Sequence, residues 1–124
     1  MSNLTPYICV ADSRAAMQWY GEVLKATVKD EPYLMDDGRI GHVELNIAGS
    51  PLMMADPFPE VNVDPPDATS GNAVSLHLDV PDCDAVAAAA VRNGARLDRG
   101  PESTSHGRSA TFRDPFGHRW IINS

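Results

Sequence analysis

The chain has 124 residues, a net charge of −7 and a hydrophobic content of 43%, enough for one compact domain without disulfides or a structural metal. Its ten basic residues form no run, which excludes proteins that track nucleic-acid phosphates. Its two cysteines form no CxxC pair, so reduced thiols are expected. No signal-type segment or long apolar run occurs, so we expect a cytoplasmic protein that does not bind membranes.

A strand and a helix are predicted near the start of the chain. Residues 7–10 form a short β-prone run, and Asp12 or Ser13 is suited to cap a helix over residues 15–24. The apolar side chains of that helix recur on one face, at Ala16, Trp19, Tyr20 and Val23.

A hairpin is predicted to complete the first half. Weak strand signals over residues 27–35 precede a strand over residues 40–47. A turn at Ala48-Gly49 then connects this strand to another over residues 51–55.

The second half repeats this order. Val10, Asp12 and Ala15 each have a counterpart 70 residues later, at Val80, Asp82 and Ala85. Asp82 or Asp84 is suited to cap the helix, and Asn93-Gly94 to end it. The predicted elements are a strand over residues 74–80, a helix over residues 85–92, a short strand over residues 95–98, and a hairpin of residues 110–113 and 118–122 around the turn DPFG.

Internal duplication explains this pattern best. Two strand-helix-strand-strand-strand modules are predicted, over about residues 1–56 and 73–124, with a Pro-rich linker over residues 57–72. One such module leaves a sheet face bare, so two modules must pair to enclose a cavity, which is the expected site. A polar stretch over residues 101–109 is predicted to be a flexible loop.

Four segments together resemble the vicinal oxygen chelate superfamily, which includes glyoxalases, dioxygenases and the fosfomycin- and bleomycin-resistance proteins. They are TPYICVAD with the following WYGEVLKA, GHVELNIAGSPLMMAD, SLHLDVPDCDAV, and RDPFGHRW. The small bacterial PhnB-like branch is the most similar group. The resemblance implies an α+β fold in which two βαβββ modules form a cup-shaped, mostly antiparallel sheet of eight strands, usually in a homodimer.

The resemblance also implies a pattern of metal ligands, suited to Zn, Ni, Mn or Fe. Metal-using relatives place a His on the first strand of each module and a carboxylate near its last strand. The matching positions are Thr5 and Ser75 on the first strands, and Met53 and Ile121 on the last. None is a good ligand, so no metal cofactor is expected. A displaced site built on His77, His42 and Glu44 is the alternative.

Strand alternation gathers candidate polar ligand contacts on one face of each module. The two sets are Ser75, His77 and Asp79, and His42, Glu44 and Asn46. His77 could contact a ligand or be a structural histidine. His106 and Arg108 in the polar loop are further candidates, as contacts for an anion or ligand at the mouth of the cup.

Aromatic and sulfur side chains suit a ligand with a planar or apolar part. The candidates are Tyr7, Tyr33, Met35, Met53, Phe58 and Trp120, although a place in the core is the stronger interpretation of Trp120. Met53 and Ile121 would make the bottom of the cup apolar, while Glu44 and Asp79 would suit a cationic group on the ligand.

These observations favour a metal-independent small-molecule-binding protein that sequesters an antibiotic or a toxic metabolite. The alternative is a divalent-metal-dependent, glyoxalase-like lyase, isomerase or dioxygenase. A third hypothesis is a structural or regulatory dimer whose cup is filled by its own side chains.

Overall fold

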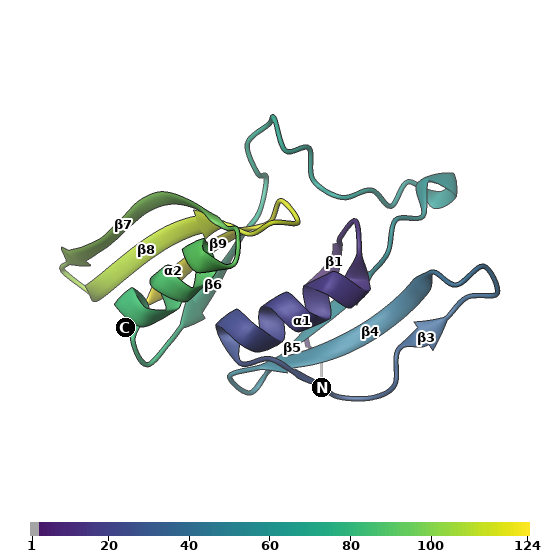
Figure 1. Ribbon diagram of the computed structural model, residues 1–124, viewed down its shortest axis with the longest axis horizontal. Helices are drawn as coiled ribbons and strands as arrows, with labels where there is room; N and C mark the ends of the chain where they lie inside the picture. Colours follow the sequence, from purple (N-terminus) through teal and green to yellow (C-terminus); the bar gives the residue numbers. More distant parts are fainter. Residues whose placement is uncertain (1–2) are drawn as a thin grey trace. The chain divides into compact units, whose positions relative to one another are not determined.

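The structure is a computed structural model that describes residues 3–124. The chain divides into two compact units, the first ending at Pro65 and the second beginning at Pro66. Each unit has a strand, a helix and then further strands (Figure 1). This order confirms the predicted α+β repeat.

The first unit is a mixed sheet with one helix. Its elements are β1 (Tyr7–Cys9), α1 (Ser13–Leu24), β2 (Thr27–Val28), β3 (Tyr33–Leu34), β4 (Ile40–Ile47) and β5 (Ser50–Ala55). The strand order is β1-β5-β4-β2, with β1 parallel to β5, and β3 also pairs with β4. The second strand of the module is therefore in two pieces, so residues 3–124 hold nine strands where eight were predicted.

The predicted first hairpin and first helix are confirmed. Ala48 and Gly49 have φ values of 53° and 85°, as a two-residue turn that follows the twist of its strands requires. Asp12 caps α1, because its carboxylate accepts a hydrogen bond from the Ala15 N–H at 3.1 Å. The buried face of α1 contains Ser13, Ala16, Trp19, Tyr20, Val23 and Leu24.

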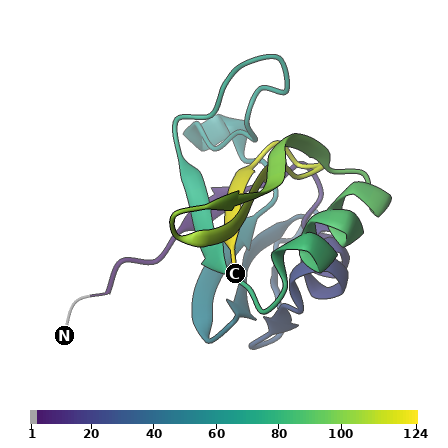
Figure 2. The same cartoon turned by 90° about the vertical axis from the view of Figure 1, so that its left-hand side faces the viewer.

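The second unit has the same plan. Its elements are β6 (Ser75–Asp79), α2 (Cys83–Arg92), β7 (Arg96–Thr104), β8 (Gly107–Arg113) and β9 (Arg119–Asn123). The strand order is β6-β9-β8-β7, with β6 parallel to β9. Figure 2 brings this unit to the front and shows α2 along one face of its sheet. Ala87, Ala90, Phe112, Trp120 and Ile122 form the core on that face.

One prediction about an irregular segment is wrong. The supposed loop over residues 101–109 is strand for most of its length, because β7 runs to Thr104 and β8 starts at Gly107. β7 is an edge strand with mostly exposed side chains, so its polar composition resembles that of a loop. The predicted linker over residues 57–72 contains the boundary between the two units, and a 3-10 turn over Pro59–Val61 closed by a bridge between Phe58 and Val63.

In both units a hydrogen bond connects the first residue of the helix to the residue after the last strand, and we call this contact the joint. The Ser13 N–H donates to Asp56 Oδ1 at 2.8 Å, and the Cys83 N–H donates to Ser124 Oγ at 3.1 Å. Asp82 caps α2 as Asp12 caps α1. These matched contacts support the internal duplication inferred from the sequence. Neither helix in residues 3–124 is long and apolar enough to cross a membrane.

Candidate ligand-binding faces

Each sheet has one face against its helix and one face turned away from it. In the first unit, the buried residues of β4 face the helix, and the alternate residues form what we call the first polar face. It consists of Tyr7, Tyr33, His42, Glu44, Asn46 and Met53. Met53 lies beside Tyr7 in the β1–β5 pair and opposite Glu44 in the β4–β5 pair, so three predicted residues are neighbours.

Tyr7 and His42 form a hydrogen-bonded pair on this face. The Tyr7 hydroxyl donates to the Gly41 carbonyl at 2.8 Å and lies 3.0 Å from His42 Nδ1. Because the hydroxyl has only one proton, the second contact requires Nδ1–H as donor. A neutral His42 therefore keeps Nε2 as an acceptor for a ligand. Partial burial raises the pKa of Tyr7, which keeps its hydroxyl protonated.

Glu44 already has a cationic partner. Its Oε2 lies 3.1 Å from Lys29 Nζ. The hydrogen bond from Lys29 to Glu44 raises the pKa of that lysine. Glu44 is thus a partly neutralised carboxylate, which weakens the argument that it attracts a cationic ligand.

The second polar face lies on the side of the β6–β9 sheet away from α2. Its members are Ser75, His77, Asp79, Thr111, Arg113, Arg119, Ile121 and Asn123. His77 lies beside Ile121, and its Nε2 is 2.8 Å from Asn123 Oδ1. With Oδ1 as acceptor, Nε2 carries the proton and Nδ1 is left to accept from a ligand.

Arg113 and Arg119 were not predicted as site residues. Their positions on either side of the DPFG turn were the signal, because residues that flank a hairpin turn pair across it. They flank that turn and lie directly opposite each other in the β8–β9 pair. Arg119 Nη1 donates to Ser75 Oγ at 2.6 Å. The second polar face therefore carries two positively charged guanidinium groups, whereas the only charged group predicted on it was the carboxylate of Asp79.

Most of the ligand positions of the metal-using relatives hold poor donors here. The register puts Tyr7 beside Met53 and His77 beside Ile121, two residues beyond the expected first-strand positions Thr5 and Ser75. One of these four positions therefore holds a good ligand, His77, and its neighbour Ile121 is not a carboxylate. Within each unit of the described chain, no three His, Cys, Asp or Glu side chains gather as a metal site requires. The residues at these positions therefore do not fit the metal.

Other predicted site residues lie elsewhere. Trp120 is 3% exposed in the core against α2, and its indole N–H donates to Asp114 at 2.9 Å. The Phe58 ring lies 4.0 Å from the Arg39 guanidinium. Arg108 pairs with Asp84 of α2 at 2.9 Å, and His106 is exposed in the β7–β8 turn.

Met35 lies near the edge of the first polar face. A Cβ atom added to Gly41 would be 2.8 Å from its sulfur, so the Met35 side chain covers this glycine. Tyr33, opposite His42, is 66% exposed. Both side chains extend an apolar margin beside the Tyr7–His42 pair.

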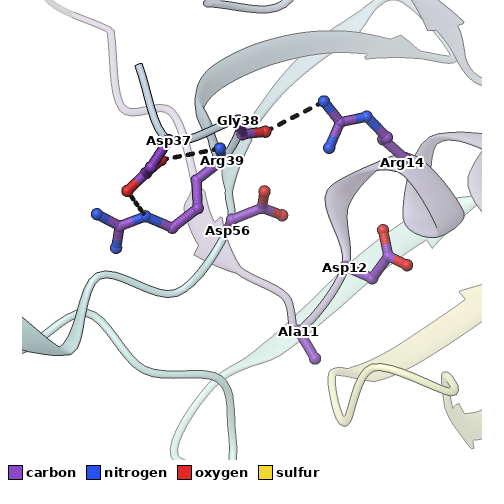
Figure 3. Close-up of a pocket in the computed structure, with 7 residues that line it drawn as sticks. All are labelled: Ala11, Asp12, Arg14, Asp37, Gly38, Arg39 and Asp56. Carbon is purple, nitrogen blue, oxygen red and sulfur yellow. Dashed lines mark hydrogen bonds and ion pairs between the residues drawn. The ribbon is translucent and has the colours of Figure 1, made fainter. Parts of the chain in front are cut away.

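A pocket of about 460 Å³ lies in the first unit, at the start of α1 (Figure 3). Its polar lining is already bonded to the protein: Asp56 accepts from the Ser13 and Ile40 N–H groups, and Arg14 donates to Gly38 O. Arg39 bonds Asp37 and Glu60. The Glu60 hydrogen bond is the main cause that raises the pKa of Arg39. These side chains bond to the protein itself and connect the start of α1 to the start of β4. We therefore place the ligand site on the polar faces.

The two cysteines, Cys9 and Cys83, are buried and are not joined by a disulfide. Burial, with smaller contributions from the charges of Asp64 and Asp56, raises the pKa of Cys9 from 9.0 to about 11, and burial also raises that of Cys83. Because the thiolate is the nucleophile, iodoacetamide should label the folded protein at pH 8 far more slowly than the urea-unfolded protein.

The sign of the Cys9 shift also predicts a pH dependence. Between pH 9 and about 11 the unfolded thiol ionises first, so the free energy of unfolding should fall as the pH rises. For the iodoacetamide prediction, mass spectrometry measures the labelling rates of the two cysteines. Equal rates in the folded and the urea-unfolded protein would contradict the assigned burial.

Comparisons with known proteins agree with this fold. A sequence model of the Glyoxalase/Bleomycin resistance protein/Dioxygenase superfamily matches residues 4–122. An uncharacterized protein of Mycobacterium bovis is 31% identical over 123 residues, which span 96% of this chain and 80% of that relative. A PhnB protein from Bacillus cereus has a similar structure, with a TM-score of 0.74, 15% identity and 98% of both chains covered. An antibiotic binding protein from a Streptomyces species has a TM-score of 0.67 at 24% identity, covering 99% of this chain and 95% of that one. The Bacillus cereus and Streptomyces proteins therefore share the fold of this chain.

Proposed function

Because the chain belongs to the glyoxalase/bleomycin resistance protein/dioxygenase superfamily, we propose that it binds a small molecule without a resident metal ion. The ligand would lie on the polar face of a sheet. The observation that carries the proposal is the pairing of Tyr7 with Met53 and of His77 with Ile121. At both equivalent positions an apolar side chain stands where metal-using relatives have a carboxylate.

The groups on the faces suit binding by contact and hydrogen bonding. The Tyr7 ring, Met53 and Ile121 offer apolar surface for a planar ligand. His42 Nε2 and His77 Nδ1 are acceptors at fixed positions, because the other nitrogen of each ring contacts Tyr7 or Asn123. Sequestration of an antibiotic or toxic metabolite fits this chemistry, and the similar fold of an antibiotic binding protein supports it.

A thermal-shift screen in the presence of EDTA tests the proposal. The probes are bleomycin, fosfomycin and a panel of planar aromatic antibiotics, since a ligand that binds the folded state must raise its melting temperature. We expect at least one probe to raise the melting temperature equally with and without EDTA. A shift that requires added Zn, Ni, Mn or Fe(II) would instead favour the metal-dependent enzyme.

A histidine pair provides the matched variants. His77→Ala should weaken binding of a positive probe by about tenfold, as expected for one lost polar contact worth about 1 to 2 kcal/mol. His106→Ala makes the same change in an exposed turn and should leave the affinity unchanged. Equal losses in the two variants, or none in His77→Ala, would remove the second polar face from the proposed site.

A further inference from the structure

A row of three arginines crosses the second unit on the side away from α2. Arg96 lies opposite Arg113 in the β7–β8 pair, and Arg113 lies opposite Arg119 in the β8–β9 pair. Like charges directly opposite each other in a sheet are destabilising. The chain has seventeen acidic residues against ten basic ones, so it has enough carboxylates to neutralise these arginines.

A carboxylate partner is found for one of the three. Arg96 Nε lies 3.0 Å from Asp98 Oδ1. In the part of the chain that the structure describes, neither Arg113 nor Arg119 has a carboxylate oxygen within 4.0 Å. These two adjacent guanidinium groups therefore form a local excess of positive charge in an acidic protein.

The two guanidinium groups keep donors that the protein does not use. Arg113 Nη1 donates to the Ser70 carbonyl at 2.9 Å, which fixes the side chain, and among residues 3–124 its Nη2 makes no hydrogen bond. Its Nε is buried and also has no partner there. Arg119 uses Nη1 to reach Ser75 Oγ. A guanidinium has five N–H donors, so most of those on Arg119 remain for a ligand. Because Ser75 accepts from Arg119, its own hydroxyl proton is also available.

The carboxylates nearby in the sequence or sheet are engaged elsewhere or lie far along the strand. Asp114 accepts from the Phe116 N–H and the Trp120 indole. Asp67 accepts from Thr69 and Ser70, and Glu102 pairs with Arg99. Asp79 is at the opposite end of β6 from Ser75. The end of the face around Arg113 and Arg119 is thus suited to negative charge.

We infer that Arg113, Arg119 and Ser75 form a subsite for an oxyanion group of the ligand, either a carboxylate or a phosphoryl group. The inference rests on the proposed function, because that function supplies the small molecule. A planar fork of N–H donors matches two oxygens of such a group, and the anion would neutralise the opposed guanidinium charges. The ligand is therefore anionic at one end and contacts Ile121 and His77 next to it.

Four one-ring probes of similar size test the charge preference by calorimetry at low salt. Benzoate and phenylphosphonate have the anionic groups, benzamide is neutral and benzylamine is cationic. We expect at least one anionic probe to bind at least tenfold more tightly than benzamide and benzylamine. Arg119→Gln should reduce that affinity at least tenfold, and raised salt should weaken binding.

Arg92→Gln is the matched control, since it removes the same charge from an exposed position on α2. Equal losses from Arg119→Gln and Arg92→Gln would overturn the inference in favour of a general charge effect. Binding of benzamide or benzylamine as tight as that of the anions would overturn it while leaving the proposed function standing. Failure of all four probes together with every antibiotic in the screen would reject both.

A second measurement does not depend on the aromatic ring of the probe. Sulfate should raise the melting temperature of the wild-type protein more than chloride at equal ionic strength, and Arg119→Gln should abolish this difference while Arg92→Gln retains it. A difference that survives in Arg119→Gln would show an effect of the salt on the whole protein and would contradict the subsite.

Discussion

Asp114→Ala is expected to lower the free energy of unfolding of the second unit by about 4 kcal/mol. Asp114 is 4% exposed and holds the DPFG turn together. Its Oδ1 accepts from the Phe116 and His118 N–H groups at 2.9 and 3.0 Å, and its Oδ2 accepts from the Trp120 indole at 2.9 Å. Alanine would leave the buried indole N–H without this acceptor, which is the most costly of the three losses.

The two tryptophans allow this change to be measured in one unit. Trp19 lies in α1 and Trp120 in β9, so a Trp19→Phe background makes Trp120 fluorescence report on the second unit alone. Urea unfolding in that background gives the difference in stability. Asp114→Asn keeps one carbonyl oxygen for the backbone donors and should recover about half of the loss. A loss below about 1 kcal/mol in Asp114→Ala would contradict the assigned network.

Asp56→Ala is expected to cost the first unit about 3 kcal/mol. Asp56 is 8% exposed, and each carboxylate oxygen accepts a backbone hydrogen bond, from Ser13 at 2.8 Å and from Ile40 at 2.7 Å. The side chain thereby joins the start of α1 to the start of β4. Its removal leaves two N–H groups without their acceptors.

Ser124→Ala is the natural control for Asp56, because Ser124 makes the corresponding contact to Cys83 in the second unit. It loses one neutral hydrogen bond at an exposed position and should cost at most about 1 kcal/mol. Urea unfolding followed by Trp19 fluorescence in a Trp120→Phe background gives the Asp56 value, and Trp120 fluorescence gives the Ser124 value. A larger effect from Ser124→Ala than from Asp56→Ala would contradict the account of the joint.

Most of the fold could be predicted from local signals. Asp12 and Asp82 predicted the two helix starts because capping chemistry acts over three residues. The turn at Ala48-Gly49 predicted the first hairpin in the same way. The edge strand β7 was predicted only over residues 95–98, and its continuation to Thr104 was missed, since its stability comes from pairing with β8 rather than from its own composition.

The candidate site was predicted less completely. Alternation placed His42, Glu44, Ser75, His77 and Asp79 on their faces, because strand geometry has a period of two. Partners across the sheet were not predictable in this way: the Lys29–Glu44 pair depends on β2 pairing with β4, and the Arg113–Arg119 pair on the register of β8 and β9. Trp120 followed the core pattern of its strand instead of facing a ligand.

The central claim is that this member of the superfamily binds its ligand without a resident metal ion. Elemental analysis of protein purified without chelator or affinity tag, followed by thermal-shift titration with Zn, Ni, Mn and Fe(II), tests it most directly. We predict metal well below one equivalent per chain and no change in melting temperature. Near-stoichiometric metal with a clear rise in melting temperature would contradict the claim and assign the polar faces to a metal-dependent enzyme.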